Sequence, residues 1–173
     1  MKNKRILKIL ALLIPLILIA LMLYLFTNLQ NKKSKLEGLQ HVPAFNLQTI
    51  DEKIFSNKDL EKEKNKVLVY FSPGCYYCQA EAEELSNLHQ NYPEIEWIWI
   101  ASEPVADIKK FAEQYKLQDV KNIKWCHDNM AMFYQQFAMN SVPYFLVYDK
   151  QNKLVLRNKG AIKLKKIIES LHQ

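Results

Sequence analysis

The chain has 173 residues, 49% of them hydrophobic, which is enough for one domain with a hydrophobic core. The formal net charge of +6 comes from the amino-terminal end, because residues 1–35 hold seven of the 24 basic residues and no acid. The 17 other basic residues face 18 acids, so the remainder is near neutral and nucleic-acid binding is excluded as a function class. Three cysteines are too few for a disulfide scaffold.

The amino-terminal segment predicts a membrane-spanning helix over residues 9–26. These residues carry no charged or strongly polar side chain and follow a basic cluster in residues 1–8. That pattern is typical of an uncleaved signal anchor, with a cleaved signal peptide as the alternative. Since the basic cluster precedes the span, we expect residues 1–8 to form a cytoplasmic tail and the rest to lie outside the cytoplasm. The polar, lysine-rich residues 27–41 are predicted to be a tether.

Residues 42–173 are predicted to form one α/β domain. Apolar runs with a period of two alternate with runs of helical period, and bounding Pro, Gly, Asp and Asn residues separate them. This order predicts a central mixed sheet, partly parallel, flanked by helices. The predicted strands are 45–50, 53–55, 67–71, 95–101, 123–127, 144–148 and 154–156, and the predicted helices are 56–60, 78–92, 105–115, 129–138 and 162–171.

The candidate reactive groups are Cys75 and Cys78, which lie where the strand 67–71 gives way to a helix. The unpaired N–H groups and the positive dipole end of a helix favour a thiolate, so Cys75 is the expected nucleophile. Cys78 follows about one turn later and is placed to resolve a mixed disulfide. A Cys-x-x-Cys in a strand-to-helix turn of a βαβ pattern indicates redox chemistry.

Three motifs resemble the membrane-anchored thioredoxin-like proteins of the TlpA/ResA type, in the redoxin (AhpC/TSA-like) superfamily. They are Pro43–Leu47, the turn Phe71–Cys78, and Ser141–Pro143 followed by a strand. The resemblance covers roughly residues 42–171. It implies a thioredoxin fold, a reversible Cys75–Cys78 disulfide and a cis Val142–Pro143 bond that receives an extended segment of the partner. An ordinary trans proline at the start of a strand is the alternative for Pro143.

The resemblance also implies a cellular role. It points to protein thiol or disulfide substrates, a membrane electron donor or acceptor, and no cofactor or metal. The expected place is the bacterial inner membrane, with the domain facing the periplasm or cell exterior, and the expected direction is reduction, for example in cytochrome c maturation. Gly74 and Val69 depart from the Trp and Asp that thioredoxins have at these positions. With Tyr76 and Tyr77 between the cysteines, the reduction potential is not predicted.

Glu81 matches the acid that ResA-like proteins place near their active cysteines. The resemblance implies that Glu81 transfers protons and tunes the pKa of a thiol. The alternative is a solvated glutamate, because this helix contains several acids.

Cys126 and His127 allow two further hypotheses, because a parallel strand 123–127 would end at the same sheet edge as Cys75. Cys126 could be a third redox cysteine, or the chain could be a copper or zinc carrier using Cys75, Cys78 and His127. We favour a buried apolar role for Cys126 and a surface position for His127. A peroxidase is the third class, but the sequence Ser72–Cys75 lacks the threonine of the peroxidatic motif.

Overall fold

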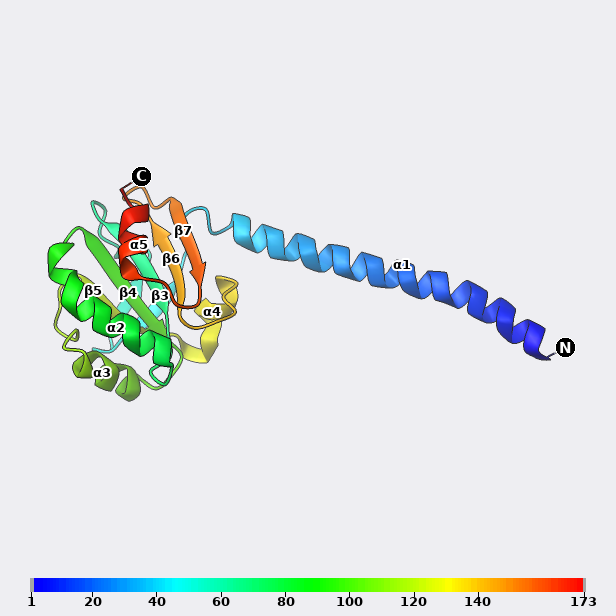
Figure 1. Ribbon diagram of the computed structural model, residues 1–173, viewed down its shortest axis with the longest axis horizontal. Coiled ribbons are helices and arrows are strands. Elements are labelled where there is room, and N and C mark those ends of the chain that lie inside the picture. Colours follow the sequence, from blue (N-terminus) through cyan, green and yellow to red (C-terminus); the bar gives the residue numbers. More distant parts are fainter. Residues whose placement is uncertain (1, 173) are drawn as a thin grey trace. The chain divides into compact units, whose positions relative to one another are not determined.

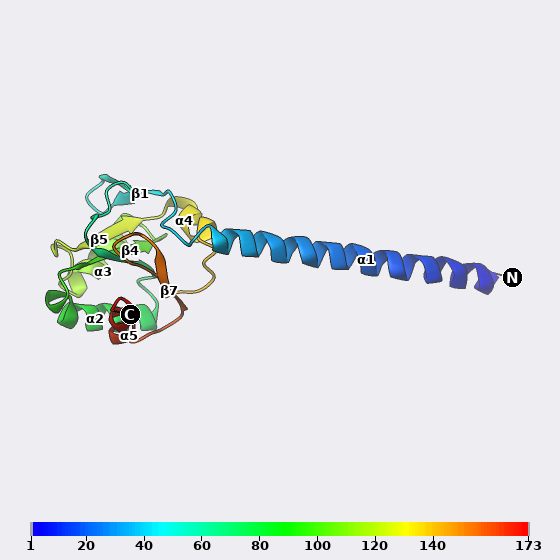
Figure 2. The same ribbon diagram turned by 90° about the horizontal axis from the view of Figure 1, so that it is seen from above.

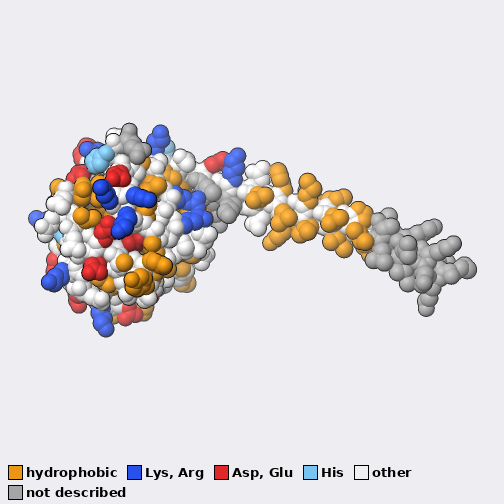
Figure 3. All heavy atoms as spheres, in the orientation of Figure 1, with side chains coloured by type: hydrophobic (Ala, Val, Ile, Leu, Met, Phe, Trp, Pro, Cys, Tyr) orange, Lys and Arg blue, Asp and Glu red, His pale blue; other side chains and the backbone are white. Residues whose placement is uncertain are grey.

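The amino-terminal helix α1 (Lys2–Glu37) forms one of two units, which divide after Glu37. The computed structural model describes residues 2–172, with side chains for residues 13–31, 33, 34 and 37–172. Leu13–Asn31 is long and apolar enough to cross a membrane, and Figure 3 shows its hydrophobic side chains in orange. The side chains of the basic cluster and of residues 9–12 lie outside the described part.

Helix α1 continues through most of the segment predicted as a tether. Residues 28–37 contain leucine, glutamine, lysine and glutamate, which favour helix, and no glycine or proline. Lys33 and Glu37 lie 3.9 Å apart, one helical turn from each other. Gly38 follows directly, where a helix is expected to stop. The tether is therefore helical up to Glu37.

The domain is built on a seven-stranded mixed sheet in the order β2-β1-β5-β4-β3-β6-β7. β3, β4 and β5 are parallel, and all other neighbouring pairs are antiparallel, which makes the mixed sheet that the sequence predicts. The strands are β1 (Asn46–Thr49), β2 (Ile54–Ser56), β3 (Asn65–Tyr70), β4 (Ile95–Ala101), β5 (Ile123–His127), β6 (Tyr144–Tyr148) and β7 (Leu154–Lys159). The helices are α2 (Tyr76–Leu88), η1 (His89–Asn91), α3 (Val105–Gln114), η2 (Asn129–Ala131), α4 (Met132–Gln136) and α5 (Leu164–Ser170).

Helices α2, α3 and α5 cover one face of the sheet, and α4 lies on the other (Figures 1 and 2). The chain steps from β3 to β4 to β5 in one direction, so right-handed crossovers place α2 and α3 on the same face. It then returns past β4 and β3 to β6, and α4 in this connection lies on the opposite face. Under α3 the Phe71 ring lies 4.8 Å from Phe111 and 5.2 Å from Trp99, measured between centroids. This aromatic core supports the carboxyl end of β3.

Two predicted helices differ from the structure. Ser56 ends β2 and residues 57–60 form a turn, because the Asp59 carboxylate accepts both the N–H and the O–H of Ser56, at 2.8 and 2.7 Å. Residues 129–138 form only the short η2 and α4, because Met130 and Ala131 adopt left-handed φ values of 57° and 53°. A side-chain cap at Asp128 cannot make a continuous helix across such a break.

Candidate active site

Cys75 is the N-cap residue of α2, which begins at Tyr76 and thus two residues before the predicted start. Its N–H donates to the Ser72 carbonyl at 3.0 Å, and its carbonyl accepts the Gln79 N–H at 3.0 Å. No side-chain hydrogen bond caps the helix, and the Cys75 side chain is half-buried at this end. The structure therefore places this thiol at the positive end of the helix dipole.

The turn before Cys75 is fixed to α2 by a hydrogen bond and is exposed to solvent at Gly74. The Gln79 side chain donates to the Pro73 carbonyl at 2.9 Å, which ties the turn to the helix. Gly74 is exposed, and a Cβ added there would meet no atom within 4 Å. Since no indole stands at this position, the turn at Cys75 is not covered by a side chain of residue 74.

Cys78 has a different environment from Cys75. It is fully buried and faces the core together with Ala82 and Leu85. Burial raises the pKa of the Cys78 thiol, so this sulfur is protonated until a reaction brings a base to it. Cys75 and Cys78 are both free thiols in the structure.

The segment Val142–Pro143 lies beside Cys75. The Cys75 sulfur is 3.9 Å from the Val142 carbonyl oxygen, within reach of a weak S–H···O contact. The Val142–Pro143 peptide bond is cis, as the resemblance implies. Pro143 is buried, and its carbonyl accepts the Gly160 N–H at 2.8 Å. The fold thus brings Cys75 close to the Val142–Pro143 segment, which lies far from it in the sequence.

Glu81 is buried, with 4% of its surface exposed. One carboxylate oxygen accepts the Ile162 N–H at 2.9 Å, and the other has no partner among the described residues. Burial raises the pKa of Glu81 to about 8, against the opposing effect of the Ile162 hydrogen bond. Cys78 and Glu81 lie three residues apart on one helix and are both buried. Glu81 is thus not a solvated acid, and a role in proton transfer stays a prediction.

Cys126 and His127 end β5 at the expected sheet edge, because β5 is parallel to β4. Cys126 is fully buried, and burial raises the pKa of its thiol. Within the described residues, no three His, Cys, Asp or Glu side chains gather as a metal site. The structure therefore does not bring together the cysteines and His127 that the metal-carrier hypothesis needs.

Sequence reasoning missed the contacts of Asp128, which it treated only as a helix cap. Asp128 is buried, and its carboxylate accepts the Tyr70 hydroxyl at 2.9 Å and the Phe133 N–H at 2.8 Å. Burial raises the pKa of Tyr70, so its hydroxyl stays a donor. The aspartate thus ties the end of β3 to α4. An aspartate directly after a buried strand is the available sequence signal, but it names no partner.

The AhpC/TSA family model matches residues 39–157. The fold is similar to DsbF from Mycobacterium tuberculosis, with 21% identity, a TM-score of 0.64, and 78% of this chain covering 94% of that one. It is also similar to a secreted M. tuberculosis disulfide oxidoreductase homologous to E. coli DsbE (23% identity, TM-score 0.64, 79% and 97% covered). A third similar structure is a putative thiol:disulfide interchange protein DsbE from Chlorobium tepidum, with 15% identity and a TM-score of 0.66. The match covers 76% of this chain and 96% of that one. No curated protein matches the chain.

Proposed function

This chain belongs to the AhpC/TSA family and has a thioredoxin-like fold, and from that premise we propose that it is a membrane-tethered protein thiol–disulfide oxidoreductase. The observation that carries the proposal is the contrast between its paired cysteines. Cys75 is half-buried at a helix N-cap, and Cys78 is fully buried one turn further along. One sulfur is accessible for attack on a partner, and the other is held back for the second step.

In the first step the Cys75 thiolate attacks one sulfur of a partner disulfide. A new bond forms between Cys75 and that sulfur, the partner's S–S bond breaks, and its second sulfur leaves as a thiolate that takes up a proton. The bend before Pro143 supplies a nearby carbonyl, that of Val142, beside the attacking sulfur. We assign the segment Val142–Pro143 the role of receiving the partner.

In the second step Cys78 loses its proton and attacks the Cys75 sulfur. The Cys75–Cys78 bond forms, the mixed disulfide breaks, and the partner leaves with both sulfurs reduced, having received two electrons. Because burial opposes ionisation of Cys78, this step needs a base. Glu81 is assigned that role, since it is the buried acid three residues away on the same helix face. The reverse sequence oxidises a partner.

We further propose that the domain faces the periplasm or cell exterior of a bacterial inner membrane and that it reduces partner disulfides, including those of cytochrome c maturation. Two observations support this place. The candidate span Leu13–Asn31 lies near the amino terminus, and one similar structure is described as a secreted protein homologous to DsbE. A membrane electron donor would restore the dithiol.

A trapping experiment tests the proposed reaction. Full-length Cys78→Ser protein in detergent micelles should accumulate mixed disulfides with partner proteins, because the resolving thiol is absent. Cys75→Ser protein should accumulate none. Equal trapping by both variants would contradict the assignment of Cys75 as the nucleophile.

A fusion experiment tests the orientation. A reporter active only on the exported side, fused after Gln173, should be active because the basic cluster precedes the span. A reporter active only in the cytoplasm should be silent at the same position. The opposite result would contradict the proposed location.

A further inference from the structure

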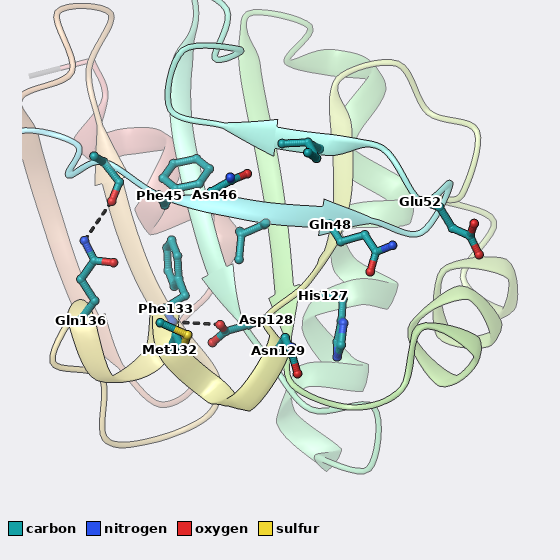
Figure 4. Close-up of a pocket in the computed structure, with 13 residues that line it drawn as sticks. Phe45, Asn46, Gln48, Glu52, His127, Asp128, Asn129, Met132, Phe133 and Gln136 are labelled. Carbon is teal, nitrogen blue, oxygen red and sulfur yellow. Dashed lines mark hydrogen bonds between the residues drawn. The ribbon is translucent and has the colours of Figure 1, made fainter.

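A groove of about 670 Å³ lies between β1 and α4, away from the cysteine pair. Figure 4 shows β1 along one side of the groove and Met132, Phe133 and Gln136 of α4 along the other. The reaction proposed above uses none of these side chains. The groove is therefore a second concave surface whose chemistry needs a separate explanation.

The hydrogen bonds of β1 alternate between its two neighbours. The Thr49 N–H donates to Lys53 at 2.8 Å toward β2, and the Ile50 N–H donates to Trp125 at 3.1 Å toward β5. In an antiparallel ladder this alternation continues along the strand. The N–H and C=O of Asn46 therefore point toward the β5 side of β1, as those of Ile50 do.

Strand β5 ends before it reaches Asn46. The last matched residues are Gln48 with His127, so the next partner of Asn46 in this register would be Asn129. Asn129 has already turned away into η2. Among residues 2–172, no hydrogen bond to Asn129 completes the ladder at this position. The groove thus begins where the ladder stops.

The carbonyl of Ala44, two residues before Asn46 on the same side of the chain, already accepts a hydrogen bond from a side chain. The Ala44 carbonyl accepts the Gln136 side-chain N–H at 2.9 Å, drawn as a dashed line in Figure 4. Asn46 is exposed and has no such side-chain partner in the described part of the chain. One N–H and one C=O therefore face the groove in strand geometry, which an extended polypeptide can satisfy.

The charges of the groove favour a basic occupant. Its lining includes the exposed Glu52 and the buried Asp128, and it contains no lysine or arginine. Exposed apolar side chains, Ile54 at 75% and Met132 at 62%, stand at the groove. An acidic lining repels phosphate, whereas a segment with basic and apolar side chains complements both features.

We propose that the groove between β1 and α4 binds an extended polypeptide segment of the disulfide-bearing partner, which pairs with the Asn46 backbone as a continuation of β5. The choice of occupant rests on the proposed function. β5 and β3 end at the same sheet edge with only β4 between them, about 10 Å apart. A segment held in the groove is thus tethered near the edge that carries Cys75, and docking raises the local concentration of the disulfide.

Peptide binding to the full-length protein in detergent micelles tests the pairing. The probe is a fluorescent, cysteine-free peptide of alternating lysine and valine, followed by anisotropy. N-methylation of alternate residues removes the N–H groups of one edge, and methylation of the other set is the matched control. We expect one set to weaken binding at least tenfold and the other less than threefold. A peptide with glutamate in place of lysine should bind at least tenfold more weakly.

Amide hydrogen exchange locates the bound peptide. Exchange of the Asn46 N–H should slow at least tenfold when the peptide binds, while that of Leu47, which faces β2, should not change. Asn46→Pro should reduce binding because it removes the groove-facing donor, and the first residue of a strand tolerates proline. Glu113→Gln, an exposed change on α3, is the surface control.

Three results would overturn the proposal. They are equal binding of both N-methylated peptides, an unprotected Asn46 N–H in the bound state, or protection of that N–H by self-association of the chain without peptide. The proposed function is tested separately with the same peptide carrying a cystine. Binding without reduction of that cystine contradicts the oxidoreductase function alone, and reduction without protection of Asn46 contradicts the groove alone.

Discussion

Two buried glutamates occupy matching environments in different parts of the domain. Glu81 in α2 and Glu96 in β4 are 4% and 0% exposed. Each accepts one backbone N–H from a distant loop, Glu81 that of Ile162 at 2.9 Å and Glu96 that of Glu61 at 3.0 Å. Each also has one oxygen without a partner among the described residues. Burial raises the pKa of both carboxyl groups.

The neighbours of the two glutamates differ. Glu81 shares the buried face of α2 with Cys78, whereas Glu96 lies opposite the fully buried Lys66 on the adjacent strand. Lys66 in turn donates to the Lys150 carbonyl at 3.3 Å. Glu96 and Lys66 therefore connect two loops to the sheet. Glu81 lies on the same buried helix face as Cys78, the thiol that loses a proton in the reaction we propose. Burial of an acid therefore does not by itself indicate catalysis. The two glutamates differ in the residue beside them, which is Cys78 for Glu81 and Lys66 for Glu96.

The largest effect on turnover should come from removing Cys75, the proposed nucleophile. Cys75→Ser should lower disulfide-exchange turnover at least a thousandfold, because an alcohol cannot replace the thiolate. Cys126→Ser should stay within threefold, since Cys126 is buried among packed residues. Turnover of a disulfide substrate by the full-length variants measures this. If both variants are inactive, a relay through Cys126 is the better explanation.

Breaking the Glu96 arrangement should reduce stability rather than activity. Glu96→Ala should lower the free energy of unfolding by about 1–3 kcal/mol, because the Glu61 N–H loses its acceptor and the buried Lys66 loses the carboxylate opposite it. Denaturant unfolding measures this change, with the exposed Glu113→Ala as a control expected within about 0.5 kcal/mol. Turnover per folded molecule should not change. If Glu96→Ala lost turnover without losing stability, Glu96 would not be purely structural, and its contrast with Glu81 would be wrong.

Conservative substitution separates the two glutamates most directly. Glu81→Gln should slow turnover roughly ten- to a hundredfold, because the amide cannot take a proton from Cys78. The same change at Glu96 should alter turnover less than twofold. The pH dependence of Cys75 alkylation should also change for Glu81→Gln alone. Superimposable rates of wild type and Glu81→Gln from pH 5 to 9 would show that Glu81 is only structural.

The smallest effect concerns stability and pH. The pKa of Glu81 rises from 4.5 in the reference state to about 8 in the fold, so the folded chain holds its proton more tightly. The corresponding stability is complete below about pH 4.5 and is lost as pH rises through about 8. Relative to Glu81→Gln, the wild type should lose at least about 1 kcal/mol between pH 5 and 8.5, as one pKa unit is worth about 1.4 kcal/mol. Equal dependence of stability on pH in the wild type and in Glu81→Gln would contradict a raised pKa at Glu81.

The sequence predicts most of the sheet because each strand has a distinct local pattern. The bounds of β4 and β5 agree with the prediction, since Ile95–Ala101 and Ile123–His127 are rich in the isoleucine and tryptophan that favour strands. The break at Met130 was not predictable, because methionine and alanine have no preference for left-handed φ. Tertiary packing and the Asp128 carboxylate determine the path there.

The site was predictable to the extent that it is local. Cys75 and Cys78 follow from a strand-to-helix turn, whereas the three-residue spacing after Cys78 places Glu81 near that cysteine but left a solvated position open. The contact of the Cys75 sulfur with Val142 joins residues far apart in sequence, and only the resemblance indicated it. The groove at Asn46 depends on where β5 stops relative to β1, and no residue pattern encodes that offset.

The cysteine at the N-cap of α2 also links the redox state of the chain to its folding. A cap that favours a thiolate stabilises the folded dithiol but not the folded disulfide, and neither form of the unfolded chain gains from it. The four states form a thermodynamic cycle, so this preference must appear in the reduction potential. About 1.4 kcal/mol of extra stability in the folded dithiol raises the potential by about 30 mV. In the proposed reaction, the position of Cys75 at this helix end therefore raises the reduction potential of the Cys75–Cys78 pair.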